Sequence, residues 1–109
     1  MKLIVIRLNL NSGLSVIGKI NKNNLNLPIL KNVLIEAIDN KIKLISTDLE
    51  LAVSYSVLCK VIEKGKFTVP AGAFLDLVEN IQSERLNIEK KDNKLEIRTD
   101  NYEALLNGI

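Results

Sequence analysis

The chain of 109 residues contains no histidine and no tryptophan, and its single cysteine is Cys59. Without histidine, the Ser-His-Asp and Cys-His arrangements of nucleophilic catalysis are excluded, as are metal sites built on histidine. One cysteine excludes an internal disulfide and paired-thiol metal sites, and it fits a reducing cytoplasm. The sequence also lacks a glycine-rich phosphate loop. We therefore expect no enzymatic activity, no metal and no cofactor.

The first 35 residues contain no acidic residue. They carry the basic residues Lys2, Arg7, Lys19, Lys22 and Lys31, for a charge of +5, whereas the remainder carries 10 basic and 13 acidic residues, for a charge of −3. This asymmetry is typical of a protein with an anionic partner near its N-terminal part, but an ordinary solvated helix face gives the same pattern. Charge alone leaves both interpretations open.

Long apolar runs and aromatic residues are scarce. Met1–Ile6 is apolar but too short for a signal peptide or a membrane span, so we expect a soluble, cytoplasmic protein. Aromatic residues make up 4% of the chain and hydrophobic residues 47%, which predicts one domain with an aliphatic core. We expect Cys59 to be a small buried apolar residue of that core rather than a reactive thiol.

Alternating hydrophobicity predicts a long, half-buried hairpin over residues 42–57. In its second half every other residue is apolar, namely Leu49, Leu51, Val53, Tyr55 and Val57. A period of two indicates a strand with one buried face. The preceding residues, Ile42 to Thr47, are also strand-like, and Thr47-Asp48 suits the turn between the two strands.

Two segments are predicted to form amphipathic helices. In Asn9–Asn21, apolar residues recur at spacings of three and four, and Asn9 is the expected N-cap. The polar outward face of this helix is expected to comprise Asn11, Ser12, Ser15, Lys19 and Lys22. The second helix, Ala71–Ile81, has one apolar face and follows Pro70, which is tolerated where a helix begins.

The remaining segments repeat one order of elements. A strand, a helix and three strands occupy residues 1–58, and the same order returns over residues 66–106, with a turn at Glu63–Gly65 between the two units. This order predicts an α+β fold, a duplicated β-α-β-β-β unit whose two helices pack side by side on one face of antiparallel sheet. We expect unpaired sheet edges at Leu49–Leu58 and Tyr102–Leu106, which invite pairing with another domain or chain.

Three motifs, in this order and at this spacing, carry a family resemblance: Leu27-Pro28-Ile29-Leu30-Lys31-Asn32, Ser46-Thr47-Asp48-Leu49-Glu50 and Phe67-Thr68-Val69-Pro70-Ala71. Over its whole length the chain resembles the first (N-terminal) domain of the bacterial DNA sliding clamp, the beta subunit of DNA polymerase III. The resemblance implies that residues 1–109 are one DNA clamp domain of a three-domain chain. It also implies an oligomeric ring of six such domains, from two subunits, that encircles duplex DNA and tethers the polymerase for processive DNA replication.

The same resemblance implies a DNA-facing patch on the first helix and the loop after it, formed by Lys19, Lys22 and Asn24. Asn24 stands where the family has a basic residue, so we expect Lys22 to replace that contact in part. The second helix lacks the basic residues usual in the family and carries Asp76 and Glu79, which weakens its expected role in DNA binding. Contacts of this kind reach the phosphate backbone and read no sequence.

Two seams with neighbouring domains are also implied by the resemblance. The last strand would pair with the third domain of the other subunit, and the residues implied at this seam are Leu77, Tyr102, Ala104 and Leu106. The opposite edge would join the second domain of the same chain, through Leu49, Leu51 and Val53. The polymerase and the clamp loader would be partners of the parent protein. The alternative is a stand-alone interaction module that pairs edge to edge with another clamp domain without binding DNA.

Overall fold

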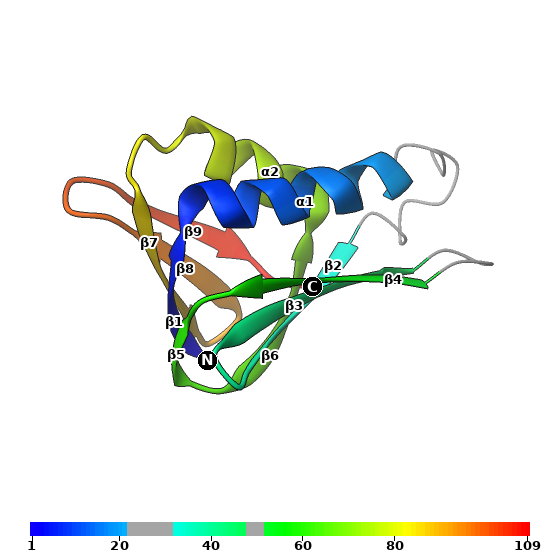
Figure 1. The fold of residues 1–109 in the computed structure, drawn as a ribbon. Coiled ribbons are helices and arrows are strands. Elements are labelled where there is room, and N and C mark those ends of the chain that lie inside the picture. The colour runs from blue at the N-terminus through cyan, green and yellow to red at the C-terminus, as the bar shows by residue number, and fades with distance from the viewer. Residues whose placement is uncertain (22–31, 48–51) are drawn as a thin grey trace.

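The structure is a computed structural model that describes residues 1–21, 32–47 and 52–109. Two helices lie side by side above two antiparallel sheets (Figure 1). In chain order the elements are β1 (Lys2–Ile6), α1 (Arg7–Asn21), β2 (Asn32–Ile38), β3 (Lys41–Thr47), β4 (Ala52–Leu58), β5 (Lys60–Glu63), β6 (Gly65–Pro70), α2 (Ala71–Asn80), β7 (Arg85–Lys91), β8 (Lys94–Arg98) and β9 (Glu103–Asn107).

The two repeats exchange their first strands. One sheet has the order β5-β1-β7-β8-β9 and the other the order β4-β3-β2-β6. Thus β1, from the first repeat, pairs with β7 of the second, while β6, from the second repeat, pairs with β2 of the first. The predicted fold class is confirmed, and the antiparallel sheet beneath the helices is divided into two.

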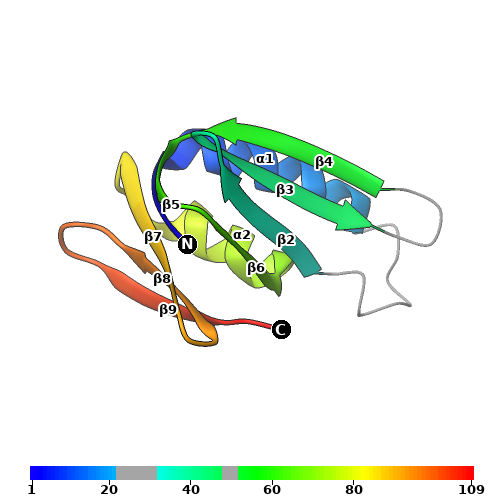
Figure 2. The same ribbon diagram turned by 90° about the horizontal axis from the view of Figure 1, so that it is seen from below.

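The core lies between the helices and the sheets, and it is aliphatic, as predicted. Helix α1 buries Leu10, Leu14 and Ile17, and α2 buries Phe74 and Val78. Seen from below, the strands lie in front of the helices, with α1 behind β4 and β3 (Figure 2). The sheets therefore form one side of the domain, and the helix pair covers the other.

Helix α1 begins at Arg7, so the prediction that Asn9 caps it is wrong. The backbone N–H of Arg7 donates a hydrogen bond of 2.8 Å to the carbonyl of Glu84. A helix leaves its first N–H groups without partners inside the helix. Because the chain beside β7 already supplies an acceptor at Arg7, the helix begins directly after β1, and Asn9 becomes an exposed residue of its first turn.

The strand β5 was not predicted. Of its four residues only Val61 is partly buried, so the segment has no alternation to detect. It adds to the edge of β1 in the five-stranded sheet. The predicted turn at Glu63–Gly65 shrinks to Lys64, where the chain passes from β5 to β6 in the other sheet.

Alternation in β4 is confirmed over the described residues. Val53 and Tyr55 are half-buried and Val57 is buried, whereas Ser54 and Ser56 between them are exposed. The strand pairs with β3, and this pairing extends as far as Thr47 of β3. Asp48 of the predicted turn, and Leu49 and Leu51 of the predicted strand, lie outside the described residues.

Gly13 sets the distance between α1 and the sheet. A Cβ at this position would lie 2.8 Å from Cδ1 of Tyr55 on β4 and 3.0 Å from Cδ1 of Leu44 on β3. Leu44 is fully buried, so it has little room to move. Glycine weakens an isolated helix, and at Gly13 this loss is accepted because it lets the helix approach the sheet closely.

Replacing Gly13 with Ala is expected to lower the free energy of unfolding. Forcing a methyl group into a filled space costs about 1–3 kcal/mol, whereas Ala gains about 1 kcal/mol over Gly in a helix interior. Gly72 on α2 is the matched control, because a Cβ there meets nothing within 4 Å, and Gly72→Ala should be neutral or stabilising. Urea unfolding of both variants checks this, and equal midpoints would contradict close packing at Gly13.

Candidate nucleic-acid face and open sheet edges

The helix pair presents one broad outer face, and the described side chains of α1 contribute an uncharged strip to it. Among residues 7–18 of the helix, the exposed side chains are Leu8, Asn9, Ser12 and Val16. Asn11 and Ser15, which were expected on this face, are partly buried. The side-chain hydroxyl of Ser12 donates a hydrogen bond of 3.0 Å to the carbonyl of Leu8. That donor is used within the helix, so it is not available to a phosphate group.

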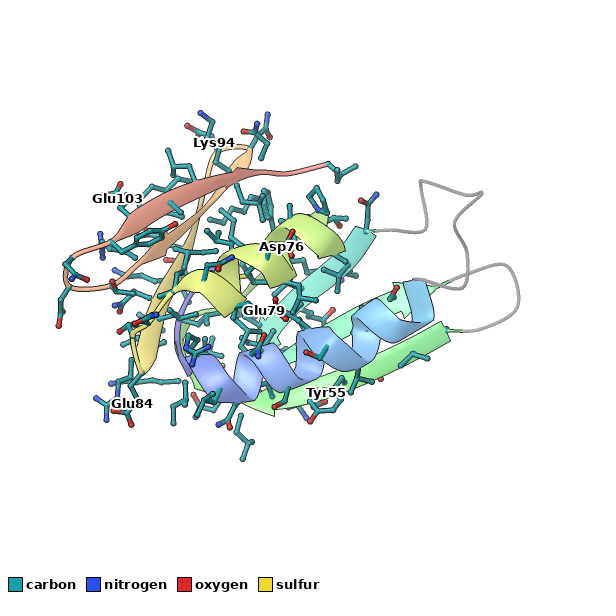
Figure 3. All side chains as sticks on the ribbon, turned by 90° about the horizontal axis from the view of Figure 1, so that it is seen from above. Tyr55, Asp76, Glu79, Glu84, Lys94 and Glu103 are labelled. Atoms are coloured by element: carbon teal, nitrogen blue, oxygen red, sulfur yellow. The ribbon has the colours of Figure 1, made fainter. Side chains whose placement is uncertain are left out.

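Helix α2 contributes negative charge to the same face. Asp76 and Glu79 are exposed on it (Figure 3), and α2 contains no basic residue. Neither carboxylate forms an ion pair with a cation in the described parts of the chain. Because like charges repel, this half of the helix face disfavours a phosphate backbone. The expectation of a weak DNA role for the second helix stays a prediction.

Of the predicted DNA-binding residues, only Lys19 belongs to an element of the described structure. Lys19 belongs to the last turns of α1, at the end far from β1 (Figure 1), and the position of its side chain is not described. Lys22 and Asn24 lie outside the described residues. The other cation on α1, Arg7, is partly buried at the opposite end of the helix.

Strand β9 is an edge of the five-stranded sheet, as predicted. It begins at Glu103, so Tyr102 belongs to the preceding turn, where 44% of its surface is exposed. Within the strand, Ala104 and Leu106 are partly buried, and Leu106 packs against the core. Leu77 on α2 is also partly buried against the core.

The backbone of β9 has free hydrogen-bonding groups on its outer side. The carbonyl of Tyr102 accepts a hydrogen bond of 2.8 Å from a residue at one end of β8. The N–H of Gly108 donates a hydrogen bond of 2.8 Å to a residue at the other end of β8. In an antiparallel strand, alternate residues direct their N–H and C=O groups to opposite sides. Ala104 and Leu106 therefore face β8, and Leu105 directs its N–H and C=O outward. In the described parts of the chain, no strand pairs with that side.

Strand β4 is the edge of the four-stranded sheet. Among the residues predicted for a seam here, Val53 is partly buried on the inner side of β4, while Leu49 and Leu51 lie outside the described residues. The last residue of β4, Leu58, is 80% exposed. Both predicted sheet edges are thus open in the described structure.

Cys59 links β4 to β5, and its side chain is partly buried against the core. Its N–H donates a hydrogen bond of 3.1 Å to the carbonyl of Asn40. Burial raises the pKa of its thiol to about 11, because the thiolate loses solvation. The thiol is therefore neutral at physiological pH, in agreement with the predicted structural role.

The reactivity of Cys59 should follow that raised pKa. The thiolate is the nucleophile, and the pKa of a free cysteine is about 8.5. Alkylation of Cys59 by iodoacetamide should therefore be slow at neutral pH. The alkylation rate should still rise about tenfold per pH unit between about pH 9 and 10, because the thiolate fraction is still increasing there. The unfolded chain in urea is the control, and its alkylation rate should level off in that pH range. A plateau in the folded protein near pH 9 would contradict a buried thiol.

The described residues contain neither a metal-binding cluster nor a membrane-spanning helix. No group of three or more Cys, Asp or Glu side chains among them is placed to hold a metal ion. None of the described helices has both the length and the apolar composition needed to cross a membrane.

Known proteins share this architecture. A family model described as "DNA polymerase III beta subunit, N-terminal domain" matches residues 1–108. The beta sliding clamp of Haemophilus influenzae is 33% identical over 85 residues, which make up 77% of this chain and 23% of that protein. The chain thus spans about a quarter of that relative's length.

Two solved structures show the same fold. Caulobacter crescentus pol III beta matches 100% of this chain and 30% of its own, with a TM-score of 0.90 and 22% identity. The Helicobacter pylori beta clamp bound to a DNA ligase peptide matches 100% of this chain and 31% of its own, with a TM-score of 0.89 and 21% identity. In both proteins the matching part is less than a third of the chain.

Proposed function

This chain belongs to the family of DNA polymerase III beta subunit N-terminal domains, and from that membership we propose that it is the first domain of a sliding clamp that encircles duplex DNA. The family is non-catalytic and acts as a processivity factor. The observation that carries the proposal is the match over residues 1–108. The side-by-side helices and the open edges β4 and β9 support it, because a ring of domains needs a continuous inner wall and edges that pair.

In this function the helix pair faces the DNA, and the contact is weak and independent of sequence. Lys19, Lys22 and Asn24 are the proposed contact residues, at the end of α1 and after it. Asp76 and Glu79 on α2 oppose the contact because they are exposed and unpaired among the described residues. The ring would retain DNA by enclosing it, so strong binding by a single domain is not required.

The two open edges are the proposed seams of the ring. Strand β9, with Leu77, Tyr102, Ala104 and Leu106, would pair with the third domain of a second subunit. Strand β4, with Leu49, Leu51 and Val53, would join the second domain of the same chain. The outward N–H and C=O of Leu105 support the first seam, because they supply backbone hydrogen bonds to a neighbouring strand.

Partner proteins are proposed for the complete clamp rather than for this domain. The Helicobacter pylori clamp has been solved with a DNA ligase peptide. We propose that a parent clamp of this chain likewise recruits its polymerase and its clamp loader. The coding sequence that follows Ile109 tests this directly, since two further domains of the same strand-and-helix order are expected there.

One observation favours a second candidate function. The described helix surface carries two acids on α2, and Arg7 on α1 is partly buried. A stand-alone module that pairs edge to edge with another clamp domain, without touching DNA, would have such a surface. The two functions differ in how binding depends on salt, because only phosphate contacts release counterions.

Duplex binding by the chain should be weak and strongly salt-dependent. Each phosphate contact contributes roughly 0.9 units to the log–log slope of affinity against salt. Replacing Lys19 and Lys22 together with Glu should abolish binding measured by fluorescence anisotropy on a labelled duplex. Lys64→Glu/Lys94→Glu is the matched control, with the same change in net charge on exposed residues outside the helix pair. Equal losses in the two double variants would contradict a localised patch, and no binding by the unmodified chain would favour the interaction module.

The β9 edge should pair through its backbone. Leu105→Pro removes an outward N–H while leaving the bonds to β8, and Leu105→Ala keeps that N–H but removes the side chain. Without neighbouring domains, copies of the chain should associate weakly at high concentration in sedimentation experiments. Leu105→Pro should abolish this association, whereas Leu105→Ala should only weaken it. Association that survives Leu105→Pro would contradict pairing at this edge, provided that urea unfolding shows the variant to be folded.

A further inference from the structure

A groove opens at the corner where the two sheets separate. The pairing of β1 with β5 ends at Ile4, opposite Lys60. Beyond this point the chain leaves β5 through Cys59 and continues into β4, which belongs to the other sheet. The upper part of β1 therefore has no neighbouring strand on this side in the described structure. The result is a hollow of about 630 Å³, here called the corner groove.

The walls of the corner groove are mainly apolar. Ile4 and Ile6 come from β1, and Leu58 comes from the end of β4. Ile6 is 41% exposed and Leu58 is 80% exposed, so both present apolar surface to solvent. A volume of several hundred cubic ångströms, lined by apolar side chains with a few polar groups, is the usual size of a binding pocket.

The polar part of the corner groove is positively charged. Lys60 and Arg85 both line it, and none of the described acidic side chains does. Both residues are exposed, and neither forms an ion pair with any carboxylate of the described residues. Elsewhere in the same sheet, Lys91 and Arg98 both contact Glu96, at 3.1 and 3.3 Å. Unlike these two cations, Lys60 and Arg85 have no carboxylate partner among the described residues.

We propose that the corner groove binds an extended peptide segment in which apolar residues alternate with carboxylates. An apolar side chain would fill the space between Ile6 and Leu58, and a carboxylate would pair with Lys60 or Arg85. Nucleic acid fits less well, because no aromatic side chain lines the groove to stack against a base. The groove lies within one chain, so the proposal does not depend on a ring.

A fluorescein-labelled peptide of alternating leucine and aspartate tests the proposal. It should bind the chain in anisotropy measurements, whereas the same peptide with lysine in place of aspartate should not. Lys60→Glu/Arg85→Glu should weaken binding about tenfold or more, because each exposed ion pair becomes a repulsion. Lys64→Glu/Lys94→Glu is the matched control, since these exposed lysines lie outside the groove and carry the same charge change.

Two further measurements separate the groove from unspecific attraction. Leu58→Ser should also weaken binding, and its high exposure means that it should leave folding intact. Cys59 lines the groove and is the only cysteine, so bound peptide should slow its alkylation. Equal affinity of the two double variants, binding of the lysine peptide, or no protection of Cys59 would overturn the proposal. Displacement of the peptide by duplex DNA would also overturn it. The same holds if the chain self-associates and only Lys60→Glu/Arg85→Glu removes that self-association.

Discussion

The exchange of first strands between the two repeats is the constraint on which the rest of the structure depends. Because β1 lies between β5 and β7, and β6 lies beside β2, each sheet is completed by a strand from the other repeat. The two helices follow directly from these exchanged strands, so they are brought side by side over the junction. The same exchange leaves the last strand of each repeat, β4 and β9, at an outer edge.

This arrangement separates the surfaces of the domain by chemistry. Among its described side chains, the helix pair presents an uncharged strip on α1 and acids on α2, and such a surface does not favour tight binding of a phosphate backbone. The edges present unsatisfied backbone groups, which suit pairing with a neighbouring domain. In the proposed function both surfaces would belong to one ring, in which enclosure holds the DNA and the seams hold the ring together.

Local patterns in the sequence predicted most of the fold. The alternation through Val53, Tyr55 and Val57 identified β4, and the open edges followed from the order of elements. Features that depend on distant residues were missed: β5 has no pattern of its own and is held by β1, and α1 begins early because Glu84 accepts a bond from Arg7. The corner groove was missed for the same reason, since it exists where β5 ends.

The pairing of Lys2 with Glu89 has a consequence for how the chain folds during synthesis. The strand β1 leaves the ribosome long before β7. Its apolar residues therefore cannot pair with β7 until most of the domain has been synthesised. Long-range pairing of this kind slows folding, because the connecting chain must lose entropy before the contact forms. Until then β1 is an exposed hydrophobic segment, and a nascent chain in that condition is a natural client for a chaperone.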